Sequence, residues 1–329
     1  AVENWRGHRA WAQTQREMAA QGEKLDLRAF VPPEIPEEQN FAALPLFARL
    51  RYRGGQGGAT SLGWPDDFSR AQKEVNRKGR RGGRSAEPGP AFTDLGAWQR
   101  AFRIVRNADP NQPIAIAAPT NASAEMLAAL EVLEGLKVYD PFLADLREAS
   151  QRPGARFPIA YDEPNPMLII LPHLAGLRDI GGVLQLRAAA GLAAGQSADA
   201  SDDVRLHLRL TDALKDEPLL ISQLVRLACF HLAAVPVREG LARHSWTEVQ
   251  LKELQGRLQT FDFLSTAQRA FRAERAFGLA GLEAVLRERI PLQGGQAGVD
   301  DPIQVTRAVR RVAPEGWLRF EQANYVRAF

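Results

Sequence analysis

The residues best suited to acid–base or metal chemistry in this sequence are its five histidines, and their spacing does not predict a metal site. They are His8, His173, His207, His231 and His244. No H-x-x-x-H or H-x-x-E-H motif, which would place two ligands on one helical face, occurs among them. His173 follows a proline at an expected helix start, where the helix dipole disfavours a cation, so we expect a neutral imidazole. We therefore predict no metal ligand.

Nucleophile and phosphate motifs are absent as well. The sequence has no G-x-S-x-G and no S-x-x-K. The glycine-rich stretch 79–85 lacks the G-x-x-x-x-G-K-[ST] spacing of a phosphate-binding loop, and no strand is expected before it. The single cysteine, Cys229, lies in an apolar helical run, which favours a buried small hydrophobe over a nucleophile. We predict no cofactor and no catalytic residue from motifs alone.

Glu274 is the residue whose position is hardest to reconcile with a purely structural helix. On a helical wheel it falls within the apolar stripe of the last long helix. An isolated buried carboxylate is very costly, so we expect a cationic partner from another helix, with Arg226 or His231 as the candidates. A structural ion pair and a catalytic acid with a raised pKa are both compatible with this position.

A local surplus of basic residues follows a glycine-rich stretch in the N-terminal third. The net charge of +3 does not by itself imply a polyanionic partner. Residues 70–84, however, carry seven Lys or Arg residues and one Glu. These cations could contact phosphates of nucleic acid or anionic lipid headgroups, or they could simply keep a loop soluble. No aromatic residue lies among residues 73–84, which argues against base stacking.

The elements expected to carry these residues are helices. Ala, Leu, Arg, Glu and Gln outnumber Val, Ile and Tyr, a balance that favours helix. From residue 172 to 289, apolar residues recur every three or four positions, and short connections imply antiparallel neighbours. Gly181, Ala188 and Gly191 keep one face small, so that another helix can approach. Ser245-Trp246-Thr247-Glu248 is typical of a capping box.

We therefore predict a mainly α protein, an antiparallel helix-hairpin bundle or array with a long irregular N-terminal arm. Residues 1–96 form the arm, Pro/Gly-rich and basic, with short helices near 4–21, 41–50 and 67–78 and an extended strap over 30–37. Residues 97–290 form the helical core. Residues 291–329 form an irregular tail packed on the core, with a turn at 315–318.

No uninterrupted apolar run reaches the roughly 20 residues of a membrane span, so we expect no transmembrane segment within this chain. The sequence begins at Ala1 rather than at methionine, which is typical of a processed chain. Any signal peptide or anchor that preceded Ala1 would have been removed with the start of the chain.

Three stretches resemble uncharacterised bacterial proteins that carry an N-terminal membrane anchor followed by an exported helical domain. They are residues 216–228, Leu171-Pro172-His173-Leu174, and Leu25-Asp26-Leu27 together with Pro32-Pro33. The resemblance implies an envelope location, on the exported or periplasmic face of a bacterial membrane, with a cytoplasmic location as the alternative. It implies no activity and no functional residues.

Two hypotheses for function follow. The first is a non-enzymatic, envelope-associated scaffold or protein-interaction domain, because the arm is long and catalytic spacing is absent. The second is a hydrolase-type enzyme whose site is assembled from distant residues, with Glu274, Arg226 and either His231 or His173 as members. An enzyme requires titratable groups converging on a pocket, whereas a binding protein exposes a broad apolar or charged surface.

Overall fold

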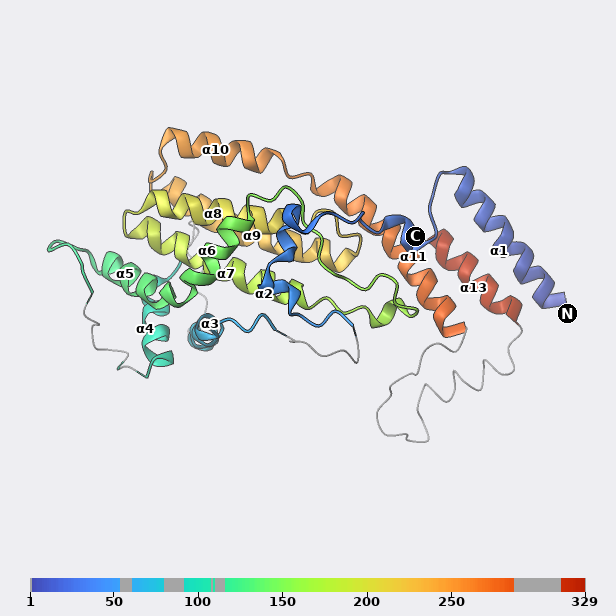
Figure 1. Ribbon diagram of the computed structural model, residues 1–329, viewed down its shortest axis with the longest axis horizontal. Helices are drawn as coiled ribbons and strands as arrows, with labels where there is room; N and C mark the ends of the chain where they lie inside the picture. Colours follow the sequence, from blue (N-terminus) through green and yellow to red (C-terminus); the bar gives the residue numbers. More distant parts are fainter. Residues whose placement is uncertain are drawn as a thin grey trace.

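The computed structural model describes residues 2–53, 61–79, 92–107, 109, 116–286 and 315–328. This described part is mainly α-helical and contains no β-strand, only one isolated parallel bridge between Asn40 and Gly154. The helices form an elongated array (Figure 1). The predicted fold, an antiparallel array of helices preceded by an irregular arm, is confirmed.

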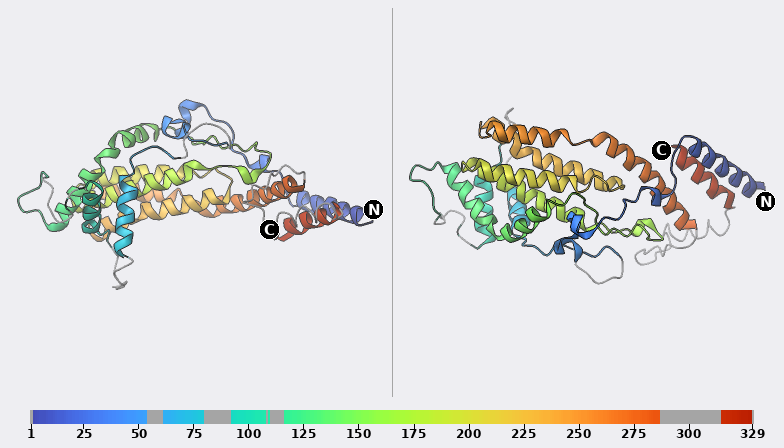
Figure 2. Two further views of the ribbon diagram at one scale, coloured as in Figure 1. Left: turned by 90° about the horizontal axis from the view of Figure 1, so that it is seen from below. Right: turned by 45° about the horizontal axis from the view of Figure 1, so that its top comes forward.

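Three long helices form the centre of the array. They are α7 (Pro172–Ala193), α8 (Ser197–Asp212) and α9 (Leu220–Ala242), and each packs on the other two. Short turns connect these three helices, so consecutive helices run antiparallel. They lie side by side in the views of Figure 1 and Figure 2. The small residues predicted on α7 allow this approach: a Cβ on Gly191 would lie 3.4 Å from Ala200 of α8. The leucines of α7 are buried, as the apolar periodicity predicted.

Close packing between α7 and α8 also encloses a histidine. His207 on α8 is 1% exposed, and a Cβ on Gly181 of α7 would lie 2.7 Å from its Nε2 atom. Burial lowers the pKa of His207 from 6.5 to about 3, because the charged imidazolium would lose its hydration. His207 is therefore neutral in the folded protein at physiological pH.

This buried histidine predicts a loss of stability in acid. Because the folded-state pKa is depressed, its contribution is complete above pH 6.5 and declines as the pH falls towards 3. Between pH 7 and pH 5 the free energy of unfolding should fall by about 2 kcal/mol through His207 alone. Urea unfolding of the wild type and of His207→Leu at both pH values would measure this. An equal pH dependence in the two proteins would contradict it.

Four shorter helices cover one end of the array. They are α3 (Asp67–Gly79), α4 (Leu95–Val105), α5 (Ala124–Leu136) and α6 (Asp140–Ala149). Ser123 caps α5, since its side chain accepts a hydrogen bond from the Met126 N–H at 3.1 Å. Arg103 of α4 and Glu131 of α5 form a buried, two-point ion pair with distances of 2.8 and 2.5 Å. α5 then packs on α7, which joins this group to the central helices.

Two further helices run along the other side of the array, namely α10 (Glu248–Gln259) and α11 (Phe263–Leu286). The capping box before α10 is real but begins two residues later than predicted. Thr247, rather than Ser245, is the N-cap, and its partner is Gln250 rather than Glu248. The threonine oxygen reaches the backbone N–H of Gln250, and the glutamine oxygen reaches back to the N–H of Thr247.

The two ends of the chain pack together. α1 (Val2–Ala20) agrees with the predicted N-terminal helix, and α13 (Glu315–Ala328) covers its apolar side (Figure 2). The prediction of an irregular tail with a turn at 315–318 is therefore wrong for 315–328. The tail residues 291–314 lie outside the described residues. Gly316 of α13 crosses Gly7 of α1 so closely that neither position has room for a Cβ atom. A lone short helix needs a packing partner to be stable, and here each terminal helix supplies that partner. The division at 96/97 and 290/291 stays a prediction.

The strap predicted over 30–37 lies between short helical turns. η1 (Leu27–Phe30) precedes it, and η2 (Glu37–Gln39), η3 (Phe41–Ala43) and α2 (Pro45–Ala48) follow. Phe41 is fully buried, whereas Phe30 and Ile35 are half-buried. The Asn40 side chain accepts a hydrogen bond from the N–H of Arg156 and donates one to its carbonyl, which ties the strap to the segment after α6.

Candidate functional site

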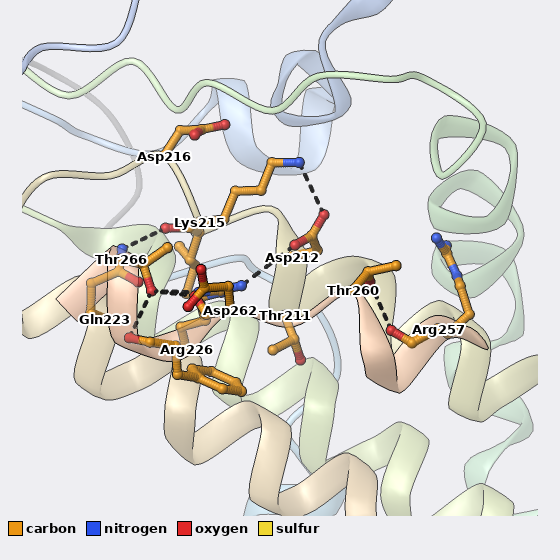
Figure 3. Close-up of polar contacts among 12 residues, drawn as sticks. Thr211, Asp212, Lys215, Asp216, Gln223, Arg226, Arg257, Thr260, Asp262 and Thr266 are labelled. Carbon is orange, nitrogen blue, oxygen red and sulfur yellow. Dashed lines mark hydrogen bonds and ion pairs between the residues drawn. The ribbon is translucent and has the colours of Figure 1, made fainter. Parts of the chain in front are cut away.

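Several polar side chains converge on the turn between α8 and α9, residues 212–220, which we call the polar junction (Figure 3). Side chains from three helices bind it: His173 of α7, Gln223 and Arg226 of α9, and Arg269 and Glu274 of α11. Three of the four residues named for the enzyme hypothesis therefore meet here.

Arg226 lies at the centre of the α9 side of the junction and is 2% exposed. Its Nη1 donates to the Thr266 hydroxyl at 3.0 Å, and its Nη2 lies 3.6 Å from a carboxylate oxygen of Asp212. The guanidinium also lies over two aromatic rings, 4.8 Å from the centroid of Phe263 and 5.4 Å from that of Phe261. Arg226 thus connects α8, α9 and the α10–α11 connection.

His173 and Glu217 form a buried pair at the other side of the junction. The imidazole Nε2 lies 2.9 Å from Oε1 of Glu217, and the His173 side chain has no exposed surface. Its ring stacks on Phe157 with a centroid distance of 4.2 Å and on Tyr52 at 5.6 Å. Burial, with the nearby Glu217 charge, raises the pKa of Tyr52 and Tyr161 far above their ordinary value. Both phenols therefore stay protonated. The His173 imidazole has no exposed surface, so it does not reach a substrate in solution.

The prediction of a cationic partner for Glu274 is wrong. Its carboxylate accepts a hydrogen bond, at 3.4 Å, from the backbone N–H of Leu220, the first residue of α9. A helix N-terminus carries partial positive charge and unpaired N–H groups, so it replaces the expected side-chain cation. Glu274 is half-buried. His231 is exposed, on the outer side of α9, and does not join the junction.

The remaining chemistry-bearing residues do not assemble a site. Cys229 is buried, and burial raises the pKa of its thiol to about 11, so the weakly nucleophilic thiol form is present at neutral pH. In the described ranges, no group of three or more His, Cys, Asp or Glu side chains is placed to hold a metal ion. The polar junction is therefore an arrangement of ion pairs and helix-end bonds that joins helices.

Part of the basic region 70–84 is helical. The short helix predicted near 67–78 is α3, and Arg70 and Arg77 on it are exposed. They pair with Asp66 and Glu74 at 3.9 and 2.6 Å, so part of the local charge is neutralised within the helix. Arg80, Arg81 and Arg84 lie outside the described residues. Nucleic acid or anionic lipid as a partner of this region stays a prediction.

A broad apolar surface lies on the outer side of α9 and α11. On α9, Ile221, Leu224 and Leu227 are 49%, 55% and 39% exposed; on α11, Leu264 and Phe271 are 72% and 52% exposed. These five residues are called the apolar face. The two helices are antiparallel, because Thr266 meets Arg226 while Glu274 meets Leu220. Ile221, Leu224 and Leu227 follow one another at intervals of three residues, so they lie along one side of α9. Leu264 and Phe271 are seven residues apart, about two turns, so they share one side of α11.

Among the described residues, α9 is the one helix that is long and apolar enough to cross a membrane, by length and composition only, and the prediction of no transmembrane segment stays a prediction. Of the most apolar 18-residue window of α9, 39% is buried inside the protein. The charged Arg226 interrupts the apolar run in the sequence, but its burial and its partners remove it from the exposed side of the helix. A helix that is apolar all round is normally covered on all sides. α9 packs on α7, α8 and α11, and one strip of its surface stays exposed.

No protein-family model matches the chain, and comparisons with curated proteins and with solved structures found no similar protein. The fold defines the chain as a mainly α array of antiparallel helices. Its resemblance to membrane-anchored bacterial proteins stays a prediction.

Proposed function

We propose that this protein is a non-enzymatic scaffold whose apolar face binds a helical segment of a partner protein, at the bacterial envelope. The observation that carries the proposal is the strip of apolar side chains that α9 leaves exposed, Ile221, Leu224 and Leu227. Exposed apolar patches of this kind mark interaction sites, and an apolar ridge at i, i+3 and i+6 suits the groove of another helix. The His173–Glu217 pair supports this view, because its burial suits packing rather than catalysis.

Charge favours a protein over a lipid surface as the partner. A helix that lies on a membrane carries Lys or Arg beside its apolar side. Between Leu220 and Val237, α9 has a single Lys or Arg, and that residue, Arg226, is buried. The part of the exposed side formed by Ile221, Leu224 and Leu227 therefore lacks the basic residues that would hold it against anionic headgroups, and the first exposed arginine of α9 is Arg238, three turns beyond Leu227.

Site-specific crosslinking in the cells that make the protein tests the proposal. A photoreactive residue at Leu224 or Phe271 should crosslink to one other protein, whereas the same residue at Val249 of α10, which is 67% exposed, should not. With that partner purified, Leu224→Glu should weaken binding at least tenfold, because a charge would be buried in an apolar contact. Val249→Glu should not. Crosslinks to lipid only, to a second copy only, or none would refute the proposal.

A further inference from the structure

A cleft of about 670 Å³ lies between the N-terminal strap and α11. Its volume is within the range of small-molecule sites, about 300–1,000 Å³. The α11 residues that line it are Ser265, Gln268, Arg269 and Arg272, a different set from the α11 residues of the apolar face. The cleft is thus a separate feature from the surface of the proposed function.

One wall of the cleft is apolar and stiff. The strap supplies Phe30, Val31, Pro32, Pro33 and Ile35. The two prolines have fixed φ angles and no N–H group, so this wall offers apolar contact with few donors. A wall that is already rigid loses little conformational entropy when a ligand binds.

The opposite wall is cationic. Spacings of three and four place the α11 residues 265, 268, 269 and 272 on one side of that helix. With Arg156 and Lys24, the cleft has four cations against two carboxylates, Glu23 and Asp216. Asp216 lies 3.6 Å from Arg269, and Glu34, beside the cleft, lies 3.7 Å from Arg156. Glu23 also pairs with Arg275, so it neutralises Arg272 only in part. The cleft therefore keeps a positive charge.

Bonds to the protein hold the arginines in position. Arg269 donates to the Lys215 carbonyl at 2.7 Å, and Arg156 donates through Nε to the Pro32 carbonyl at 3.1 Å. Arg272 lies 3.3 Å from Glu23 through Nε. A guanidinium has five N–H groups in a planar fork, so these bonds orient each arginine and leave other donors for an anion.

We propose that this cleft binds a small organic anion with an apolar body, its charged group on Arg269 and Arg272 and its apolar body on the strap. A medium-chain carboxylate has this chemistry. This anion site is separate from the apolar face proposed to bind a partner protein, and neither proposal depends on the other.

Titration calorimetry of the whole chain with sodium decanoate tests the site, with decan-1-ol as the uncharged match. Decanoate should bind, and decanol should bind at least tenfold more weakly. Arg272→Gln and Lys24→Gln remove charges from exposed side chains. We expect Arg272→Gln to lower the decanoate affinity roughly tenfold or more, the loss typical of a charged hydrogen bond, and Lys24→Gln to lower it less.

Two controls locate the bound decanoate. Arg257→Gln changes an exposed arginine of α10 and should leave the affinity of the protein for decanoate unchanged. Leu224→Glu on the apolar face should also leave it unchanged. Amide exchange at residues 29–31 and 34–35 of the strap should slow when decanoate is bound. Equal affinity for decanol, wild-type affinity in Arg272→Gln, or loss of decanoate binding in Leu224→Glu would overturn the proposal. The last result would place the decanoate on the apolar face and leave the proposed function untouched.

Discussion

Replacing Glu131 with leucine is expected to lower the free energy of unfolding by about 3–5 kcal/mol. Glu131 and Arg103 are buried together between α4 and α5, with side chains 5% and 7% exposed. Without the carboxylate, Arg103 keeps its charge, because a guanidinium does not lose its proton in a protein. It would remain in a poorly hydrated position without the partner that makes two bonds to it. Urea unfolding monitored by circular dichroism would measure the loss.

A double variant separates the cost of losing the Glu131 carboxylate from the value of the ion pair itself. Arg103→Met with Glu131→Leu removes both charges and keeps apolar volume, so we expect stability near that of the wild type. Glu253→Leu is the matched surface control, because Glu253 pairs with Arg205 where both side chains are 45% exposed. It should cost less than about 1 kcal/mol. A double variant as unstable as Glu131→Leu alone would contradict this account.

Arg226→Ala is expected to destabilise the protein by about 3–5 kcal/mol, a loss of the size seen when large core side chains are truncated. The substitution removes the bond to Thr266, the charge opposite Asp212 and the contact with two phenylalanine rings. It would also leave a space between three helix ends. Thermal and urea unfolding would measure the effect, with Arg257→Ala on the exposed side of α10 as the control.

Arg226→Lys sharpens the test of what Arg226 does. Lysine keeps the charge but not the planar group that stacks on rings and donates in two directions. We expect it to recover less than half of the stability that alanine loses. Full recovery by lysine would mean that charge alone matters at the polar junction. A fully stable Arg226→Ala would show that Arg226 does not hold the helices together, and would reopen its assignment to a site of another kind.

The helices were largely predictable from the sequence. Apolar spacing located α7 to α11 because a helix buried on one side must repeat its apolar residues at helical pitch. Ser123 and the small residues of α7 were predictable for local reasons, namely capping and close approach. The cap of α10 was misplaced because Ser245 and Thr247 are both good cap residues, two positions apart, and only the folded backbone selects one.

The partners of the candidate residues were less predictable. Glu274 was correctly judged to need compensation, but its partner is a helix end, which has no signature in residue identity. Glu217 lies in the Asp216-Glu217-Pro218 turn, where no local pattern predicts a histidine partner. The relation of His173 to Glu217, 44 residues apart, depends on how α7 packs against that turn. α13 was mistaken for a turn because Gly316, which weakens a helix in isolation, allows it to cross α1 closely.

The sequence by itself determined that this chain would form helices and that α7 would be buried against its neighbours. Those features depend on neighbours within one or two turns. The tertiary structure alone decided that α1 and α13 pair, that three candidate residues meet at the polar junction, and that one apolar strip of α9 stays exposed. These depend on segments far apart in the chain, whose packing minimises exposed apolar area and unpaired charge over the whole molecule, a condition that no local pattern specifies.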